Sequence, residues 1–490
     1  MLTKVTTNSV IAKIMGTIVL IEGIAMIVPW IWAEVAGEMN SVFAFRICVP
    51  VTLAVGLILT LFFRSGTTDF GVREGYIVVA AAWIISSIIG AFPYYLSGAV
   101  DNYISAFFEA VSGFTTTGCT CIKGPALNHS LLLWKAISNW LGGMGILVFV
   151  ISVLPALGIS GQFIVRAETP GPVYEKTTVR ISNSARMLYV TYATFTVIEF
   201  ILLLISRKMS LLDCIILTLG SVSTGGVITN PLGLSYYDSL YVEIVVSAFC
   251  ILSSINFILY YHLVRGRITR IIRDIEVRAF FIIIGSGALL CAFCLTMKTD
   301  LTAAEALRES VIQMANICTT SGFVRDVSFT WPTACQFIFL GAMIIGGCAA
   351  STSGSLKVVR FLVMLKLIGR GCIRRIHPRS VVAVKIGGES VSAPVVSAIT
   401  VFSLTYFGLI LLSALILSLQ GHDMETNMTT AIAMLSNTGT AFTSHVSTGN
   451  FSDFNSGLKL YLSFIMITGR LELFTIIILL TRSFWGRSSR

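Results

Sequence analysis

The stretch NYISAFFEAVSGFTTTG, residues 102–118, joins a short apolar segment to three threonines and a glycine. Its apolar part ends at residue 114 and has polar residues on both sides. A helix of about 12 residues rises only about 18 Å, whereas the hydrocarbon core of a bilayer is about 30 Å thick. We therefore predict that this segment enters the membrane and returns on the same side without crossing it.

The same arrangement occurs four times, at intervals of roughly a hundred residues. Each copy has a half-length apolar stretch, then small hydroxyl or amide residues, then a glycine. The polar ends are Thr116, Thr117, Gly118; Ser223, Thr224, Gly225; Thr320, Ser321, Gly322; and Asn437, Thr438, Gly439. One Thr-Gly pair carries little information, but four at quasi-regular spacing predict an ion filter built with four-fold pseudosymmetry from a single chain.

Full-length apolar runs flank these half-spans. We predict an all-α polytopic membrane protein, with two N-terminal helices followed by four pseudo-repeats of helix, re-entrant pore loop and helix around a central pore. The N-terminal segment 1–70 contains spans 10–33 and 41–63, and the repeats are 71–160, 161–270, 271–385 and 386–490. Their flanking spans are 75–96 and 131–157, 187–205 and 241–264, 277–297 and 333–367, and 391–419 and 458–481; their half-spans are 102–114, 211–222, 303–318 and 425–436.

Composition also places the chain in a bilayer. Of its 490 residues, 55% are hydrophobic and 12% are charged, with a mean hydropathy of +0.86; a soluble domain carries about 25% charged residues. The net charge of +10 is concentrated in alternate connections, without the interleaved aromatic residues of a nucleic-acid-binding surface. This positive-inside pattern predicts a multi-pass protein of the cytoplasmic membrane, with both termini cytoplasmic and no nucleic-acid partner.

An enzymatic function is disfavoured. The five histidines lie mostly in loops or at span edges, and the chain has no His-Glu-x-x-His motif and no paired intramembrane aspartates. Cys119-x-Cys121 has no second pair at zinc-ligand spacing. No nucleotide-binding motif occurs, so regulation by a nucleotide would require a partner. We predict a protein that is not an enzyme and has no covalent cofactor.

A carboxylate lies near the start of every half-span: Asp101, Asp213, Glu305 and Asp423. There it can cap free amides and complement the positive end of the helix dipole. The negative C-terminal ends would then point at the pore, which favours a cation. Ordinary N-capping without a pore is the alternative interpretation.

The filter residues suit potassium. Backbone carbonyls can replace the hydration shell of this ion, and glycine allows successive carbonyls to face the axis. Flanking Ser, Thr and Asn side chains supply further oxygens. The segments contain no ring of Asp or Glu, which argues against a calcium-type filter. We expect potassium as the bound substrate.

The segments FTTTG, STGG, TTSGF and SNTG resemble those of the Trk/Ktr/HKT superfamily of potassium transporters, and the two extra N-terminal helices resemble the bacterial Trk-H type. Three further stretches resemble family motifs in the right order: WLGGMGI at 140–146, GGCAASTSG at 346–354 followed by Lys357, and GRLE at 469–472. The resemblance covers nearly the whole chain. It implies potassium uptake, a homodimer and a cytosolic nucleotide-binding regulatory ring.

Carried over to this chain, the resemblance makes Gly118, Gly225, Gly322 and Gly439 the filter glycines. Related transporters commonly follow the fourth filter glycine with Pro-Gly, whereas this chain has Thr440-Ala441. That departure leaves the selectivity against sodium open. A secondary transporter of cations or solutes with different or weak ion selectivity is therefore the alternative function.

The stretch 346–354 interrupts an apolar span with small and hydroxyl residues. It is either a kinked helix with satisfied backbone groups or, as the resemblance implies, an intramembrane loop that obstructs the pore below the filter. The predicted gate residues are Gly346, Gly347, Ser351, Thr352, Gly354, Lys357 and Arg470.

Four charged side chains lie in apolar context: Arg470, Glu472, Glu109 and Glu199. Arg470 lies in the last span, where a central arginine costs about 2.5–3.5 kcal/mol; it either reaches the interface or faces the pore as a barrier to cations. Glu472 lies on a different helical face and is a poor partner for it. Glu109 and Glu199 either pair with buried bases or stabilise the pore helices.

Overall fold

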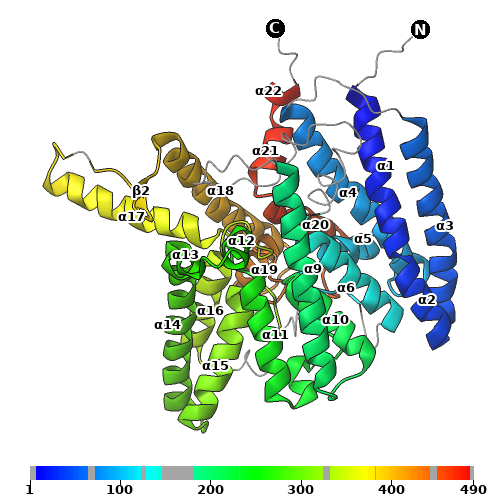
Figure 1. The fold of residues 1–490 in the computed structure, drawn as a ribbon, viewed down its shortest axis with the longest axis horizontal. Coiled ribbons are helices and arrows are strands. Elements are labelled where there is room, and N and C mark those ends of the chain that lie inside the picture. Colours follow the sequence, from blue (N-terminus) through cyan, green and yellow to red (C-terminus); the bar gives the residue numbers. More distant parts are fainter. Residues whose placement is uncertain are drawn as a thin grey trace.

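The computed structural model describes residues 7–63, 72–122, 128–145, 181–230, 232–323, 331–380, 382–441 and 450–485. The secondary structure of these ranges is almost entirely α-helical (Figure 1). The exception is a short antiparallel hairpin of β1 (Lys385–Ile386) and β2 (Glu389–Ser390). The predicted all-α fold class is confirmed.

The N-terminal helices form one side of the molecule (Figure 1). α1 (Thr7–Ala25) continues into α2 (Ile27–Ala36), and α3 (Met39–Phe62) returns along them. A β-carbon added to Gly16 or Gly56 would lie less than 3 Å from atoms of the facing helix. These glycines let the two backbones approach closely, as small residues do between membrane helices. The two predicted N-terminal spans are thus present.

Within the described ranges, six helices are long and apolar enough to cross a membrane, or up to eight if each bent helix pair is one span. Besides the N-terminal spans they are α4 (Val72–Leu96), α9 (Ile181–Ile205), α14 (Ile275–Lys298) and α18 (Ala393–Ser418). α14 and α18 expose large apolar side chains such as Phe293 and Leu411. Such surfaces are expected where lipid surrounds a helix, so the chain is a multi-pass membrane protein.

Each of these four long helices packs against the short helix that follows it: α5 (Tyr103–Phe114), α10 (Leu211–Val222), α15 (Ala303–Cys318) and α19 (Met424–Leu435). Three of the short helices have 12 residues and α15 has 16. They rise about 18–24 Å, too little to cross about 30 Å of hydrocarbon. The predicted half-spans are confirmed as helices to within one residue at either end.

Two half-helices have the predicted carboxylate in a capping box, Asp213 with Ser210 and Glu305 with Thr302. Asp423 is at the N-cap of α19 as predicted, but its side chain makes no capping hydrogen bond to the backbone and instead accepts one from Thr426 Oγ1. The prediction was wrong for α5, where Asn102 and not Asp101 is the cap. The Asn102 side chain accepts a hydrogen bond from Ser105 N at 2.8 Å. Asparagine caps a helix as well as aspartate does, so Asp101 stands one position outside the cap.

The helices that follow the half-helices are α6 (His129–Gly143), α11 (Leu240–Ser253), α16 (Thr333–Ile345) and α20 (Ser456–Arg470). Two predicted continuous spans are wrong. Span 241–264 is divided into α11 and α12 (Phe257–Val264), bent by 98°, and span 458–481 into α20 and α21 (Phe474–Leu480), bent by 117°.

The other two predicted spans that follow half-spans are 333–367 and 131–157. The predicted interruption at 346–354 is confirmed, because α16 ends before it and α17 (Val358–Ile376) begins after it. Span 131–157 begins with α6, and its part beyond residue 145, including Ile146 of the WLGGMGI stretch, lies outside the described residues.

A long-range contact explains the break between α11 and α12. The Ser253 carbonyl oxygen accepts hydrogen bonds from N and Oγ1 of Thr352, at 3.2 and 3.0 Å. The Ser254 carbonyl oxygen accepts one from Cys348 N at 2.9 Å, and the Asn256 side chain caps α12. Carbonyls at the end of α11 therefore bind the interrupted region of the third repeat, a partner that hydropathy does not reveal.

The beginnings of α1 and α4 and the last helix, α22 (Arg482–Trp485), lie at the same end of the molecule (Figure 1). The Arg73 guanidinium lies 5.3 Å from the centre of the Phe484 ring and 5.8 Å from that of Trp485. α17 projects sideways from the helical body and carries Lys366, Arg370, Arg374 and Arg375. The short helix α13 (Ile268–Arg273) adds Arg270 and Arg273. The basic residues Arg64, Arg166, Lys176, Arg180, Arg487 and Arg490 lie outside the described residues.

Candidate functional site

The chain turns at two equivalent positions after each half-helix. The first is a non-glycine residue with φ between 54° and 59°, namely Thr116, Thr224, Thr320 and Asn437. The second, two residues later, is a glycine at positive φ, namely Gly118, Gly226, Gly322 and Gly439. A threonine in this conformation costs roughly 1–3 kcal/mol. Its recurrence in three segments indicates that the surrounding structure fixes this backbone.

The hydrogen bonds of the four segments repeat in the same way. Each glycine N donates at 3.3 Å to the carbonyl oxygen six positions earlier, in the pairs Gly118–Ser112, Gly226–Gly220, Gly322–Asn316 and Gly439–Ala433. The residue before each glycine donates to the same oxygen at 2.8–3.1 Å. Amides of the segment thus satisfy a carbonyl at the end of its own half-helix.

The four segments close into a ring. A β-carbon on any of the four positive-φ glycines would lie less than 3 Å from a carbonyl oxygen of the next segment. The pairs are Gly118 with Gly225, Gly226 with Ser321, Gly322 with Thr438, and Gly439 with Thr117. Because the last pair returns to the first segment, these contacts run around one axis. Only glycine fits at the crossings.

The ring corrects the predicted alignment of the second segment by one residue. Gly226, not Gly225, has the backbone conformation of Gly118, Gly322 and Gly439. Gly225 takes the place of Thr117 in the first segment, and its carbonyl oxygen accepts a hydrogen bond from Asn139 Nδ2 at 3.1 Å. The tandem glycines Gly225 and Gly226 were a sequence signal for two possible alignments. Matching Ser-Thr-Gly at 223–225 to Thr-Thr-Gly at 116–118 selected Gly225, which is the wrong one.

The side chains next to the glycines are directed into their own segments. Thr117 Oγ1 lies 2.7 Å from Thr115 Oγ1, Ser321 Oγ donates to the Asn316 carbonyl at 2.9 Å, and Thr438 Oγ1 lies 2.9 Å from Ser436 Oγ. Asn437 Nδ2 donates to Thr117 Oγ1 at 3.1 Å and so links the fourth segment to the first. Hydroxyls thus brace the backbone, and the carbonyls form the crossings of the ring.

Two cavities involve the predicted site residues. The first, about 180 Å³, is lined by the ring residues Thr117, Gly118, Gly225, Gly226, Ser321, Gly322, Thr438 and Gly439 and by Lys135. The second, about 140 Å³, is lined by the predicted gate residues Ser351, Gly354, Lys357 and Arg470 together with Gly143, Ser353 and Glu472. Seven predicted filter residues thus line the first cavity and four predicted gate residues line the second. The other predicted site residues line neither cavity: Thr116, Ser223, Thr224, Thr320, Asn437, Gly346, Gly347 and Thr352.

The loop between α16 and α17 contacts the ends of three repeats. Thr352 Oγ1 lies 3.4 Å from Thr224 Oγ1, and Gly354 N donates to Thr320 Oγ1 at 2.9 Å. Ser355 Oγ donates to the Ser436 carbonyl oxygen at 3.4 Å. Two of these partners are side chains of the positive-φ threonines of the ring segments, so the loop contacts those segments directly.

Internal contacts give this loop a defined shape. Gly346 ends α16 at a φ of 72°, and a β-carbon on Gly347 would clash with Ser353 Oγ. Ser351 Oγ donates to the Cys348 carbonyl oxygen at 2.6 Å, and Lys357 Nζ donates to the Ser353 carbonyl oxygen. The predicted gate residues thus form an ordered non-helical loop, and the kinked-helix interpretation is wrong.

Arg470 ties this loop to the first repeat. Its Nη1 donates to the Thr352 carbonyl oxygen at 2.7 Å. Its Nη2 donates to the carbonyl oxygens of Gly142 and Gly143, at 2.7 and 2.8 Å. Arg470 also lines the second cavity. The side chain therefore lies inside the molecule beside the loop and does not reach out to the interface.

Glu472 is paired with Arg360, a residue of α17 that sequence reasoning missed. The Arg360 guanidinium also lies over the Phe402 ring, 4.0 Å from its centre. The partners are 112 positions apart, so no local pattern predicts the pair. It fixes the beginning of α17 to the turn after α20.

Of the two other acids of apolar context, Glu109 belongs to half-helix α5 and Glu199 contacts half-helix α10. Glu109 pairs with Lys135 Nζ at 2.7 Å, and both side chains are buried. Lys135 Nζ also donates to the Cys119 carbonyl oxygen at 2.6 Å, directly after the first ring glycine. Glu199 accepts a hydrogen bond from Ser221 Oγ of α10 at 2.5 Å. Lys135 was missed in the sequence, although a lysine in an apolar run was a signal for such a pair.

Replacing Lys135 with methionine should lower the free energy of unfolding by about 3–5 kcal/mol, because the Glu109 carboxylate would stay buried without its counter-ion. Thermal unfolding of the purified protein in detergent measures the effect. The exposed Lys208, replaced in the same way, is the control and should leave the transition unchanged. Adding Glu109→Gln to Lys135→Met should restore part of the loss; a strictly additive second loss would contradict the pairing.

The sequence matches the family model described as cation transport protein, TrkH, over residues 41–486. The chain belongs to the TrkH family. Relatives include the Trk system potassium uptake proteins TrkH of Halomonas elongata, 33% identical, and of Escherichia coli K12, 31% identical. Each alignment covers 97% of this chain and 99% of the relative.

A solved structure agrees with this assignment. The crystal structure of the potassium transporter TrkH from Vibrio parahaemolyticus matches with a TM-score of 0.87 and 28% identity, covering 98% of this chain and 100% of that one. The predicted resemblance to the bacterial Trk-H type is confirmed. Membership of a cation transport family also confirms that the chain is a transporter and not an enzyme.

Proposed function

We propose that this TrkH-family chain takes up potassium across the cytoplasmic membrane of a bacterium through the ring of four segments. The observation that carries the proposal is the closed set of glycine–carbonyl crossings from Gly118 to Gly439. A ring of carbonyls can replace the hydration shell of a monovalent cation. The relatives named as potassium uptake proteins support potassium as the substrate.

The filter comprises the predicted residues Thr116, Thr117, Gly118, Ser223, Thr224, Gly225, Thr320, Ser321, Gly322, Asn437, Thr438 and Gly439, with Gly226 added. The described residues contain no cluster of three or more His, Cys, Asp or Glu side chains able to hold a metal. In this proposal potassium is the substrate, and backbone oxygens of the ring bind it. Carbonyl dipoles supply partial negative charge without a full charge that would trap the ion.

The gate comprises the loop residues Gly346, Gly347, Ser351, Thr352, Gly354 and Lys357 together with Arg470. Contacts of this loop with Thr224 and Thr320 support a position beneath the filter. The Arg470 charge next to the second cavity would oppose a passing cation. Movement of the loop would open the pathway.

The assembly and its orientation are further parts of the proposal. The pseudo-repeats 71–160, 161–270, 271–385 and 386–490, preceded by 1–70, are the structural units, and two chains form a homodimer. Both termini and the basic connections face the cytoplasm, where a nucleotide-binding regulatory ring docks. The basic helix α17 supports a cytoplasmic position for that connection.

Uptake of rubidium into liposomes containing the purified chain tests the function. Potassium, sodium and chloride are added one at a time, each as a salt with an impermeant counter-ion, to compete with rubidium. Potassium should compete well above sodium, and chloride should not compete. Equal competition by sodium would contradict a selective potassium filter and favour the alternative, a transporter of weak cation selectivity, with Thr440-Ala441 as the first segment to examine.

A further inference from the structure

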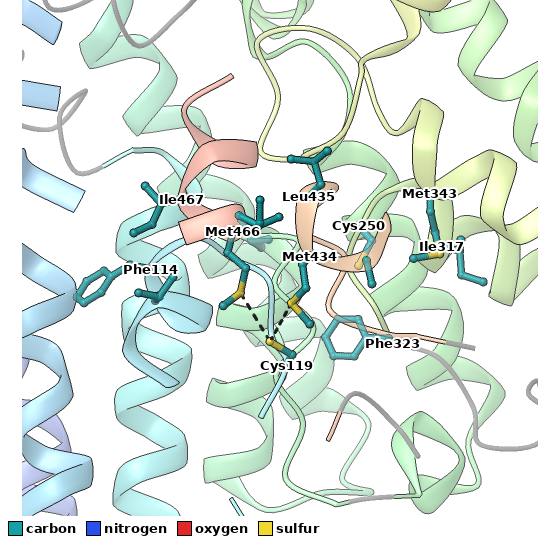
Figure 2. Packing of buried hydrophobic residues seen from close by; sticks show 14 of the residues in the cluster. Phe114, Cys119, Cys250, Ile317, Phe323, Met343, Met434, Leu435, Met466 and Ile467 are labelled. Atoms are coloured by element: carbon teal, nitrogen blue, oxygen red, sulfur yellow. Dashed lines mark hydrogen bonds between the residues drawn. The ribbon is translucent and has the colours of Figure 1, made fainter. Parts of the chain in front are cut away.

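The Cys119 thiol, directly after the first ring glycine, faces the sulfur atoms of Met434 and Met466 (Figure 2). Cys119 Sγ lies 3.8 Å from Met466 Sδ and 4.0 Å from Met434 Sδ. Cys119 comes from the segment after Gly118, Met466 from helix α20 and Met434 from half-helix α19. A thiol therefore contacts two thioethers that lie 315 and 347 residues away in the sequence.

Cysteine and methionine often fill cores as soft apolar side chains, and all three are fully buried. The pseudosymmetry of the ring provides an internal comparison. The positions equivalent to Cys119 hold Val227, Phe323 and Thr440, and those equivalent to Met434 hold Gly113, Ser221 and Ile317. The other segments pack at these positions without sulfur, so the fold does not require the sulfur cluster.

The sulfur spacing fits a metal ion. In a trigonal site the distance between sulfurs is the metal–sulfur bond length multiplied by √3, so a bond of about 2.3 Å, as in zinc–thiolate sites, requires about 4.0 Å. The measured distances from Cys119 Sγ agree with this value. We propose that Cys119, Met434 and Met466 form a site for a soft monovalent metal ion of the copper(I) or silver(I) class.

The ligand chemistry distinguishes this site from the ion pathway. Thiolate and thioether sulfur select soft ions such as copper(I), whereas hard cations prefer oxygen ligands. Binding replaces the Cys119 S–H bond with a metal–sulfur bond, and the proton is released to water. The thiolate then balances the charge of the monovalent ion, so the buried cluster gains no net charge.

An ion bound here would act on the filter. The Cys119 carbonyl oxygen accepts hydrogen bonds from Ser112 Oγ and Lys135 Nζ, each at 2.6 Å. These bonds fix the backbone of the segment next to Gly118. Gly118 and Thr120, on either side of Cys119, line the first cavity, so the sulfur cluster is adjacent in sequence to residues of that cavity. Inhibition of transport by such an ion is the expected consequence, and that part alone rests on the proposed function.

Silver nitrate in chloride-free buffer is the probe for binding, with full-length protein in detergent. A Cys372→Ser background removes a cysteine that is exposed. Titration calorimetry should find one silver site whose affinity falls at least tenfold in Cys119→Ser and in Met434→Leu/Met466→Leu. X-ray absorption spectroscopy at the silver edge should show three sulfur neighbours around the bound silver ion. The control is Cys318→Ser, since the Cys318 thiol is equally buried and faces the Gly346 carbonyl oxygen at 3.7 Å; it should retain the site.

The proposal would be overturned if Cys119→Ser bound silver with the parent affinity. It would also be overturned if silver had a single sulfur neighbour in the protein that retains Cys119, Met434 and Met466. Both results are independent of transport, so they would leave the proposed function untouched. In the rubidium uptake assay, half-maximal inhibition of the parent protein should need at least tenfold less silver than half-maximal inhibition of Cys119→Ser. The uptake of each protein is normalised to its own rate without silver. Absence of rubidium uptake without silver would instead count against the proposed function.

Discussion

Replacing Gly226 with alanine should abolish the preference for potassium over sodium, with at least a tenfold fall in the uptake ratio. The Gly226 φ of 65° strains any residue with a β-carbon by roughly 1–3 kcal/mol. The new methyl group would also lie less than 3 Å from the Ser321 carbonyl oxygen. Because that oxygen belongs to the neighbouring segment, the ring must widen or distort. Uptake of rubidium competed by potassium and by sodium measures the ratio.

Two comparisons make this prediction specific. Gly285→Ala is the matched control, since a β-carbon there meets nothing within 4 Å, and it should keep the parent ratio. Gly225→Ala combined with Asn139→Ala should retain more selectivity than Gly226→Ala, because Asn139 is the group that a β-carbon on Gly225 would strike. Thr117, Ser321 and Thr438 show that the Gly225 position accommodates a side chain.

Gly118→Ser and Gly322→Ser should lower selectivity for the same reason, since each added β-carbon would clash with the next segment. Parent-like selectivity in a folded Gly226→Ala, Gly118→Ser or Gly322→Ser protein would contradict the filter assignment. Loss of selectivity in Gly225→Ala/Asn139→Ala with none in Gly226→Ala would show that the originally predicted alignment is right.

Replacing Arg470 with alanine should raise potassium flux at least tenfold in liposomes that contain no regulatory partner. The side chain joins the Thr352 carbonyl of the loop to the Gly142 and Gly143 carbonyls of the first repeat. A hydrogen bond from a charged group contributes about 1.5–3 kcal/mol, and about 1.4 kcal/mol changes a population tenfold. Losing even one bond that holds the closed loop would shift it toward the open state.

The substitution also removes a positive charge beside the second cavity, so a second variant is needed to separate the two effects. Arg470→Lys keeps the charge but cannot reproduce the planar guanidinium fork, and it should give an intermediate flux if the bridge matters. Arg374→Ala, at an exposed position of α17, is the control. Shortening 346–354 should raise flux as well. Unchanged or reduced flux in folded Arg470→Ala protein would refute the gating role.

Local sequence patterns predicted much of this architecture. Hydropathy and length located the half-helices α5, α10, α15 and α19, because a segment too short for the bilayer is recognisable without its neighbours. The interruption at 346–354 was equally visible from its small and hydroxyl residues. Two helix breaks were missed, after α11 and after α20, although Ser253, Ser254 and Asn256 lie at the first and Gly469, Arg470 and Glu472 at the second. The apolar residues on both sides of each break make the two helices look like one continuous span. At the first break the backbone carbonyls of Ser253 and Ser254 bind the loop of another repeat.

The sequence by itself determined that the chain is a membrane protein, that it has four polar turns ending in glycine, and which family it belongs to. Each of these depends on composition or on neighbouring residues. Only the tertiary structure decided that Gly226 closes the ring, that Lys135 pairs with Glu109, that Arg360 pairs with Glu472, and that Arg470 bridges the loop to α6. The physical reason is that these contacts join residues distant in the chain, and their partners are fixed by packing and backbone conformation, which no local pattern records.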